Sequence, residues 1–129
     1  MSERNCLIVD SEPAIRSLLR TILTFRNLQS VEAENAVSAL TIVQTFCGRL
    51  DLIVSEVNTP GDMNGLELAR AIRNTFPWIP IILTSVYNDN AGGFDLILKP
   101  FAPNAILNAV DKAMTFRSER ALHAAAGHQ

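Results

Sequence analysis

Short apolar runs alternate with longer segments of helical periodicity along the 129 residues of this chain. Five of these runs are closed by polar or turn-forming residues, which is typical of strands buried on both faces of a parallel sheet. They cover residues 5–9, 28–33, 52–54, 80–83 and 96–98. The second run is interrupted by Ser30 and Glu32, so we expect it at an edge of the sheet.

Apolar residues at helical spacing predict four helices between and after these runs. Their limits follow from prolines, glycines and one capping asparagine: between Pro13 and about Phe25, between Asn35 and Gly48, between Gly65 and Pro77, and from Pro103 into the Ala-rich segment 122–129. The segment VYNDNAGGFD joins the fourth and fifth runs. It is too short and too rich in Asn, Asp and Gly to predict a helix.

Alternation of strands and helices indicates a parallel sheet with helices on both faces, because right-handed crossovers place a helix between successive parallel strands. With five strands, we predict an α/β, doubly wound, flavodoxin-like fold with strand order 2-1-3-4-5, since a barrel needs about eight strands. The length favours one domain over residues 1–129, with a core of about 4–118 and a tail of 119–129.

Composition and charge narrow the function classes. Hydrophobic residues make up 48% and charged residues 19% of the chain, which is typical of a folded protein. The net charge of −2 gives no general attraction to nucleic acid or to an anionic membrane surface. Because the first residues do not resemble a signal peptide and no apolar stretch is long enough to span a bilayer, we expect a cytoplasmic protein.

Two cysteines fit a reducing compartment. Cys6 lies in an apolar strand pattern and Cys47 near a predicted helix end. We expect buried thiols at both positions, in preference to a disulfide or a redox role.

Polar residues follow four of the predicted strands: Asp10, Glu56, Thr84 and Lys99. Each alone has an ordinary explanation, as a helix cap or as solvated surface. Because the carboxyl ends of parallel strands meet at one edge of the sheet, we expect all four to converge there. Two carboxylates, a hydroxyl and an ammonium suit an anionic ligand held through a divalent cation.

At these positions the sequence resembles a known family over nearly its whole length. LIVDSEPAIRSLL is similar to the first strand and helix of the receiver domains of bacterial two-component response regulators. DLIVSEVNTPGDMNGLEL resembles their third strand and loop, IILTS their fourth strand and LILKPF their fifth. Lys-Pro after an apolar strand is weak evidence alone, but four motifs in the right order are specific.

The resemblance implies roles for the strand-end residues. Receivers take a phosphoryl group from a sensor kinase onto an aspartate after the third strand, assisted by Mg²⁺ held by an acidic pair after the first. Asp10 falls on the first acid of that pair, Thr84 on the hydroxyl residue and Lys99 on the family's lysine. The second acid is replaced by Ser11, and the phosphate-accepting aspartate by Glu56.

These two replacements weaken the expected chemistry. Serine is a poor substitute for a carboxylate ligand of Mg²⁺, so binding at Asp10 and Glu56 should be weak at best, and Glu12 would have to turn inward to compensate. Glutamate can form an acyl phosphate, but its extra methylene moves the carboxylate about 1.3–1.5 Å outward. We therefore expect slow or absent phosphorylation.

Two interpretations of Glu56 remain. Its carboxylate could occupy the phosphoryl position near Lys99 and Thr84 and hold an active-like state. Alternatively, it pairs with Lys99 and locks an inert fold. We favour the second, because a carboxylate has fewer acceptor oxygens and less charge than a phosphate.

The surface that many receivers use for partners should also differ. The switch position, three residues before Lys99, carries Leu96 where the family usually has an aromatic side chain. The short separation between Thr84 and Lys99 predicts that most of the family's fourth helix is missing or reduced to a turn. Asp62, in the loop after the third strand, is interpreted as a solvated acid and not as a substitute acceptor.

We therefore expect a stand-alone, atypical receiver domain that is not an enzyme and acts by protein–protein contact. Its partner would be a sensor histidine kinase, a phosphotransfer protein or a downstream regulator, with no attached output domain and no nucleic acid or membrane ligand; its oligomeric state is not predicted. One rival is a working phosphoacceptor or a small Mg²⁺-dependent phosphotransferase or phosphatase that uses Glu56. A nucleotide or flavin binder is disfavoured, because no glycine-rich phosphate-binding loop follows the first strand.

Overall fold

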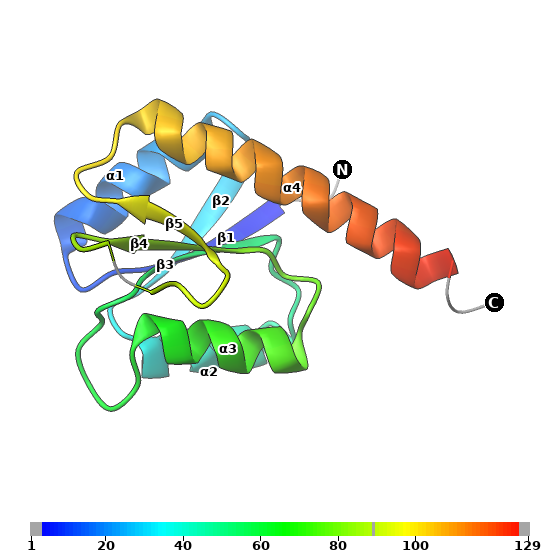
Figure 1. Cartoon of the computed structure of the whole chain (residues 1–129), viewed down its shortest axis with the longest axis horizontal. Helices are drawn as coiled ribbons and strands as arrows, with labels where there is room; N and C mark the ends of the chain where they lie inside the picture. The colour runs from blue at the N-terminus through cyan, green and yellow to red at the C-terminus, as the bar shows by residue number, and fades with distance from the viewer. Residues whose placement is uncertain (1–3, 89, 127–129) are drawn as a thin grey trace.

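The computed structural model describes the backbone of residues 4–88 and 90–126 and the side chains of residues 4–88 and 90–115. In this part of the chain strands alternate with helices except between the last two strands, β4 and β5 (Figure 1). The strands are β1 (Arg4–Val9), β2 (Leu28–Ala33), β3 (Leu52–Glu56), β4 (Ile81–Ser85) and β5 (Asp95–Leu98). The helices are α1 (Pro13–Thr24), α2 (Ala36–Thr45), α3 (Gly65–Thr75) and α4 (Pro103–Ala126).

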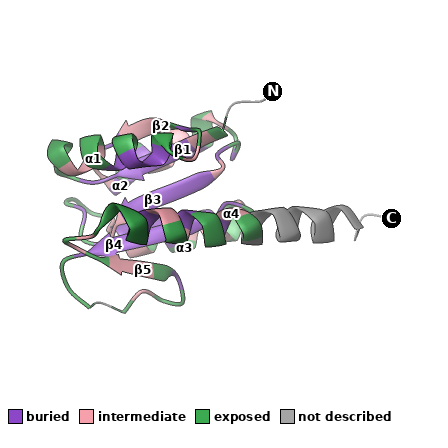
Figure 2. Ribbon diagram, turned by 90° about the horizontal axis from the view of Figure 1, so that it is seen from above, coloured by how far each residue is buried: buried purple, intermediate pink, exposed green. Residues whose placement is uncertain are grey.

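All paired strands run parallel, in the order β2-β1-β3-β4-β5. The doubly wound, flavodoxin-like fold is therefore confirmed. So is the edge position of β2. The central strands are buried on both faces, as Figure 2 shows for β1, β3 and β4, which explains why they read as continuous apolar runs and not as alternating patterns.

The core lies in two layers, one on each face of the sheet. Alternate side chains of a strand point to opposite faces. Leu7 and Val9 of β1 pack in the layer under α2 and α3, whereas Cys6 and Ile8 pack in the layer under α1 and α4. The two helix pairs accordingly cover opposite faces of the sheet (Figure 1).

Helix starts follow the caps in the sequence. The Asn35 side chain accepts a hydrogen bond from the Ser38 amide at 2.8 Å and caps α2, as predicted. Asn64 and Glu67 form a reciprocal capping box at the start of α3, where only Gly65 was expected to mark the boundary. Such caps satisfy amides that a helix leaves without partners at its first turn.

The connection between β4 and β5 contains no helix within its described residues, 86–88 and 90–94. The shortened fourth helix expected from the sequence is thus confirmed. Instead, Phe94 is buried against the α2–α3 layer, with the Arg73 guanidinium 4.3 Å from its ring centroid. The connection is therefore anchored on α3 by an aromatic side chain.

α4 continues to Ala126, into the Ala-rich segment where the last helix was expected to end; residues 127–129 of that segment lie outside the described residues. The two cysteines differ from one another in burial. Cys6 is buried as predicted, and burial raises the pKa of its thiol. The prediction of a buried Cys47 is wrong. That residue is exposed, because it follows the end of α2 in a left-handed backbone conformation (φ 52°).

No helix in the described part of the chain combines the length and apolar character needed to cross a bilayer.

Candidate functional site

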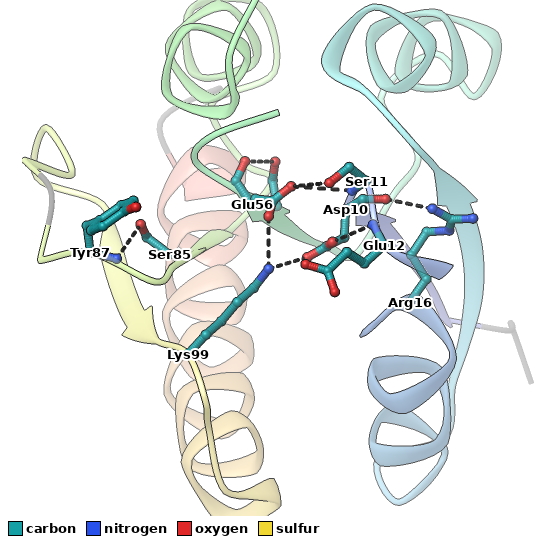
Figure 3. Close-up of polar contacts among 9 residues, drawn as sticks. Asp10, Ser11, Glu12, Arg16, Glu56, Ser85, Tyr87 and Lys99 are labelled. Carbon is teal, nitrogen blue, oxygen red and sulfur yellow. Dashed lines mark hydrogen bonds and ion pairs between the residues drawn. The ribbon is translucent and has the colours of Figure 1, made fainter. Parts of the chain in front are cut away.

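The carboxyl edge of the sheet gathers the predicted strand-end residues. In the β3–β4 ladder Glu56 pairs with Thr84. Asp10 directly follows Val9, which pairs with Ser55, so Asp10 lies beside Glu56 on the neighbouring strand. The parallel register therefore places these side chains in one row, and Lys99, which follows β5, reaches toward them (Figure 3).

Lys99 joins the two carboxylates of this cluster. Its Nζ lies 2.8 Å from Asp10 Oδ2 and 2.9 Å from Glu56 Oε2. The three side chains are 7%, 1% and 12% exposed for Lys99, Asp10 and Glu56, respectively. A buried ion cluster of this kind is maintained only when its members are mutually paired, since each charge alone is costly to desolvate.

The remaining carboxylate oxygens also have donors from the chain. Ser11 donates twice to Glu56 Oε1, from its amide at 3.3 Å and its hydroxyl at 3.1 Å. The Glu12 amide donates to Asp10 Oδ1 at 2.9 Å. Thus each of the four oxygens of Asp10 and Glu56 accepts at least one hydrogen bond from the protein (Figure 3).

The charge state of Lys99 follows from this arrangement. Burial opposes the ammonium, but hydrogen bonds and Coulombic attraction from Asp10 and Glu56 outweigh that effect and raise the pKa of Lys99 above its ordinary value. Lys99 is therefore a cation at neutral pH and partly neutralises the two carboxylates.

Thr84 lies in the same row but makes no corresponding contact. The residue is 1% exposed, and its Oγ1 has no hydrogen-bond partner within the described part of the chain. Its backbone carbonyl accepts the Val57 amide at 2.8 Å. The hydroxyl expected to meet Glu56 is therefore buried without being used by it.

The exit of β3 is fixed by close packing against α3. The Gly65 amide donates to the Val57 carbonyl at 2.8 Å. A Cβ on Gly65 would lie 1.8 Å from the Glu56 carbonyl oxygen, so only glycine fits this position. This contact sets the backbone from which the Glu56 side chain projects.

Other candidate residues fall outside the cluster. Asp62 is exposed in the β3–α3 loop. Leu96 is half-buried against the α2–α3 layer, and its role as a switch position stays a prediction. Arg16 has the sequence spacing of a solvated helix face, but its side chain is largely covered. It is 16% exposed, donates to the Asp10 carbonyl at 2.7 Å and pairs with Glu32 at 3.0 Å.

Within the described residues, no three His, Cys, Asp or Glu side chains are grouped so as to hold a metal ion. The carboxylates of Asp10 and Glu56 are the acidic groups of the cluster, and the Lys99 ammonium lies between them. This donor set does not fit the hard divalent cation that receivers use, which prefers several oxygen ligands free of competing cations.

The fold and the strand-end cluster define a flavodoxin-like domain with paired charges at the carboxyl edge of its sheet, and comparison with known proteins identifies its family. The protein-family model described as the response regulator receiver domain matches residues 6–111 of this chain. The chain belongs to this family, whose members act in two-component signalling.

Curated relatives are longer regulators. The chain is 28% identical to the DNA-binding transcriptional regulator NtrC of Proteus hauseri, over 93% of this chain and 26% of NtrC. It is 35% identical to the transcriptional regulatory protein ResD of Bacillus subtilis, over 92% of this chain and 51% of ResD. The chain therefore spans about a quarter to a half of the length of these two relatives.

Solved structures show the same fold. The signal receiver domain of an HD domain-containing protein from Pseudomonas fluorescens Pf-5 superimposes with a TM-score of 0.82 at 24% identity, over 92% of this chain and 99% of that one.

Proposed function

We propose that this receiver domain acts by protein–protein contact and is not phosphorylated at the position where receivers accept phosphate. The observation that carries the proposal is the bonding of Glu56: one carboxylate oxygen lies on Lys99 and the other accepts both donors of Ser11. Phosphoryl transfer depends almost entirely on positioning and charge stabilisation. An acceptor whose two oxygens are both engaged is poorly placed to attack in line.

The cation that assists transfer in the family is also disfavoured. To bind Asp10 and Glu56, Mg²⁺ would have to displace Lys99 and the donors of Ser11 and Glu12. Serine at position 11 offers a neutral hydroxyl in place of a carboxylate, and Mg²⁺ gives up its water ligands reluctantly. Any binding of Mg²⁺ should accordingly be weak.

Between the two interpretations of Glu56, inert pairing with Lys99 is better supported than mimicry of phosphate. A phosphoryl group in a receiver would contact both the hydroxyl residue and the lysine. Glu56 contacts Lys99, but the Thr84 hydroxyl has no partner in the described structure. Only one of the two contacts is reproduced.

The partner is accordingly a protein: a sensor histidine kinase, a phosphotransfer protein or a downstream regulator in the cytoplasm. The names of the curated relatives describe transcriptional regulators, which favours a regulator as the output. We propose no enzymatic activity, since the candidate nucleophile Glu56 is held by Lys99 and Ser11.

Intact-mass spectrometry tests this proposal. The chain and its Glu56→Asp variant are incubated with acetyl phosphate and Mg²⁺, and the masses are compared before and after. We expect no phosphoryl adduct on the wild type. An adduct that maps to Glu56 or Asp62 would show a working phosphoacceptor, and the proposal would be wrong. An adduct confined to the Glu56→Asp variant would identify Glu56 as the residue that disables the site.

A further inference from the structure

We infer that Ser11 is a positioning residue that holds the Glu56 carboxylate on Lys99, and that this pairing of Ser11 with Glu56 excludes divalent cations. The two residues replace the second acid of the Mg²⁺-binding pair and the phosphate-accepting aspartate of the receiver pattern, and they contact one another directly. The inference deepens the proposed function and rests on it. The inference adds that Glu56 alone is not sufficient to exclude a divalent cation, because the orientation of its carboxylate depends on the residue at position 11.

The contact between Ser11 and Glu56 depends on the length of the Glu56 side chain. Glu56 spans from the Ser11 donors, at 3.1 and 3.3 Å, to Lys99 at 2.9 Å. An aspartate at position 56 is shorter by one methylene, about 1.5 Å, and could not make both sets of contacts. The length of Glu56 is therefore what brings it to Ser11.

The contact also depends on a neutral hydrogen-bond donor at position 11. An aspartate there would place a third carboxylate beside Glu56 and Asp10, where Ser11 now supplies hydrogen-bond donors. The added carboxylate would repel those of Asp10 and Glu56, although the exposure of position 11 lets water screen part of that repulsion. With Glu56 in place the added acid would push the longer carboxylate away and would not complete a cation site.

With Ser11 present, the Lys99 ammonium supplies the positive charge that a bound cation would otherwise supply to the two carboxylates. Its ammonium touches both carboxylates, and Ser11 and Glu12 satisfy the outward oxygens. The cluster is complete without a metal ion, since positive charge and hydrogen-bond donors are all supplied by the chain. A cation would have to break bonds to every member of the cluster.

Mg²⁺ titration of four chains tests the inference: the wild type, Ser11→Asp, Glu56→Asp and the double variant. Binding is followed by NMR through the amide signals of Ser11 or its replacement and of Val57. If the residues are coupled, the double variant binds Mg²⁺ at least about tenfold more tightly than expected from the two single effects combined. Ser17→Asp, an exposed change on α1, is the matched control and should not alter binding.

Ser11→Ala provides a second test that adds no charge and keeps the backbone donor. Loss of the hydroxyl should loosen Glu56 and raise Mg²⁺ affinity by about fivefold, the change expected for one net hydrogen bond. Ser17→Ala is its control. Unfolding of the Ser11→Asp chain would leave this comparison intact. Equal Mg²⁺ affinity of wild type and Ser11→Ala would overturn the positioning role.

The outcomes separate the inference from the proposed function. If the effects of Ser11→Asp and Glu56→Asp on Mg²⁺ affinity simply add in the double variant, the two residues act independently and the inference is wrong. That result would leave the absence of phosphorylation on the wild-type chain untouched. Conversely, a phosphoryl adduct on Glu56 of the wild type would defeat the proposed function, whatever the titrations show.

Discussion

Replacing Lys99 with Met removes the ammonium that joins Asp10 and Glu56 and keeps an unbranched side chain of similar length. Both carboxylates are nearly inaccessible to water, at 1% and 12% exposure. They would be left close together without their common cation. Because a buried charge deprived of its partner is far costlier than an exposed one, we expect a large loss of stability at neutral pH.

The size of this loss follows from the contacts that survive. Breaking a buried pair by removing one partner costs about 3–5 kcal/mol. Ser11 would still donate to Glu56, and the Glu12 amide to Asp10, so the lower end of about 3 kcal/mol is appropriate. With a urea dependence of about 2 kcal/mol per molar, the unfolding midpoint should fall by about 1.5 M.

Urea unfolding at pH 7, followed by circular dichroism, measures this change. Arg26→Met is the matched control, because Arg26 pairs with Asp111 on the surface, where both side chains are exposed. Exposed pairs contribute little, so the control midpoint should stay close to that of the wild type. Equal midpoints for the Lys99→Met chain and the control would refute the view that the cluster is a mutually dependent group of buried charges.

The pH dependence of the stability difference between the wild type and Lys99→Met gives an independent check. The pKa of Lys99 is raised in the folded state, so the stability that its charge contributes is complete below the unfolded lysine pKa of about 10.4. It is lost as the pH rises through the higher folded value. The gap between wild type and Lys99→Met should therefore be constant from about pH 7 to 9 and narrow above about pH 10.4. A gap that narrows well below that range would contradict the assignment of Lys99 as the cation.

Two further predictions concern packing and thiol access. Gly65→Ala should destabilise the fold by about 3 kcal/mol in urea unfolding, because the new Cβ would strike the Glu56 carbonyl. Gly61→Ala, whose Cβ meets open space despite a positive φ, should cost clearly less, and equal losses would count against the steric explanation. A thiol reagent should modify Cys47 rapidly in the native state and Cys6 only on unfolding, since the first is exposed and burial raises the pKa of the second. Peptide mapping of the labelled chain would decide this, and rapid native labelling of Cys6 would be inconsistent with its burial.

The fold could be read from the sequence because its signals are local and mutually consistent. Continuous apolar runs identified strands covered on both faces, and the Asn35 cap placed the start of α2. The convergence of Asp10, Glu56 and Lys99 also followed, since parallel strands present their carboxyl ends at one edge. Topology fixes such relationships without any knowledge of side-chain conformation.

The side-chain contacts within the cluster could not be predicted from the sequence. Ser11 and Glu56 are 45 positions apart, and their hydrogen bond depends on the side-chain conformation of a long carboxylate. Arg16 lies at a helical spacing typical of exposed faces, yet it reaches the Asp10 carbonyl. Cys47 is exposed because the backbone turns at the end of α2. Each of these depends on three-dimensional geometry that periodicity does not encode.

The most direct test of the account is an NMR comparison of the wild type and the Ser11→Asp/Glu56→Asp double variant, with and without acetyl phosphate and Mg²⁺. We expect unchanged amide signals for the wild type at Ser11, Val57 and Thr84. The double variant should show shifts around the same edge of the sheet. Shifts of the wild-type signals at that edge, comparable with those of the double variant, would contradict the claim that Glu56, held by Ser11 and Lys99, prevents phosphorylation and Mg²⁺ binding.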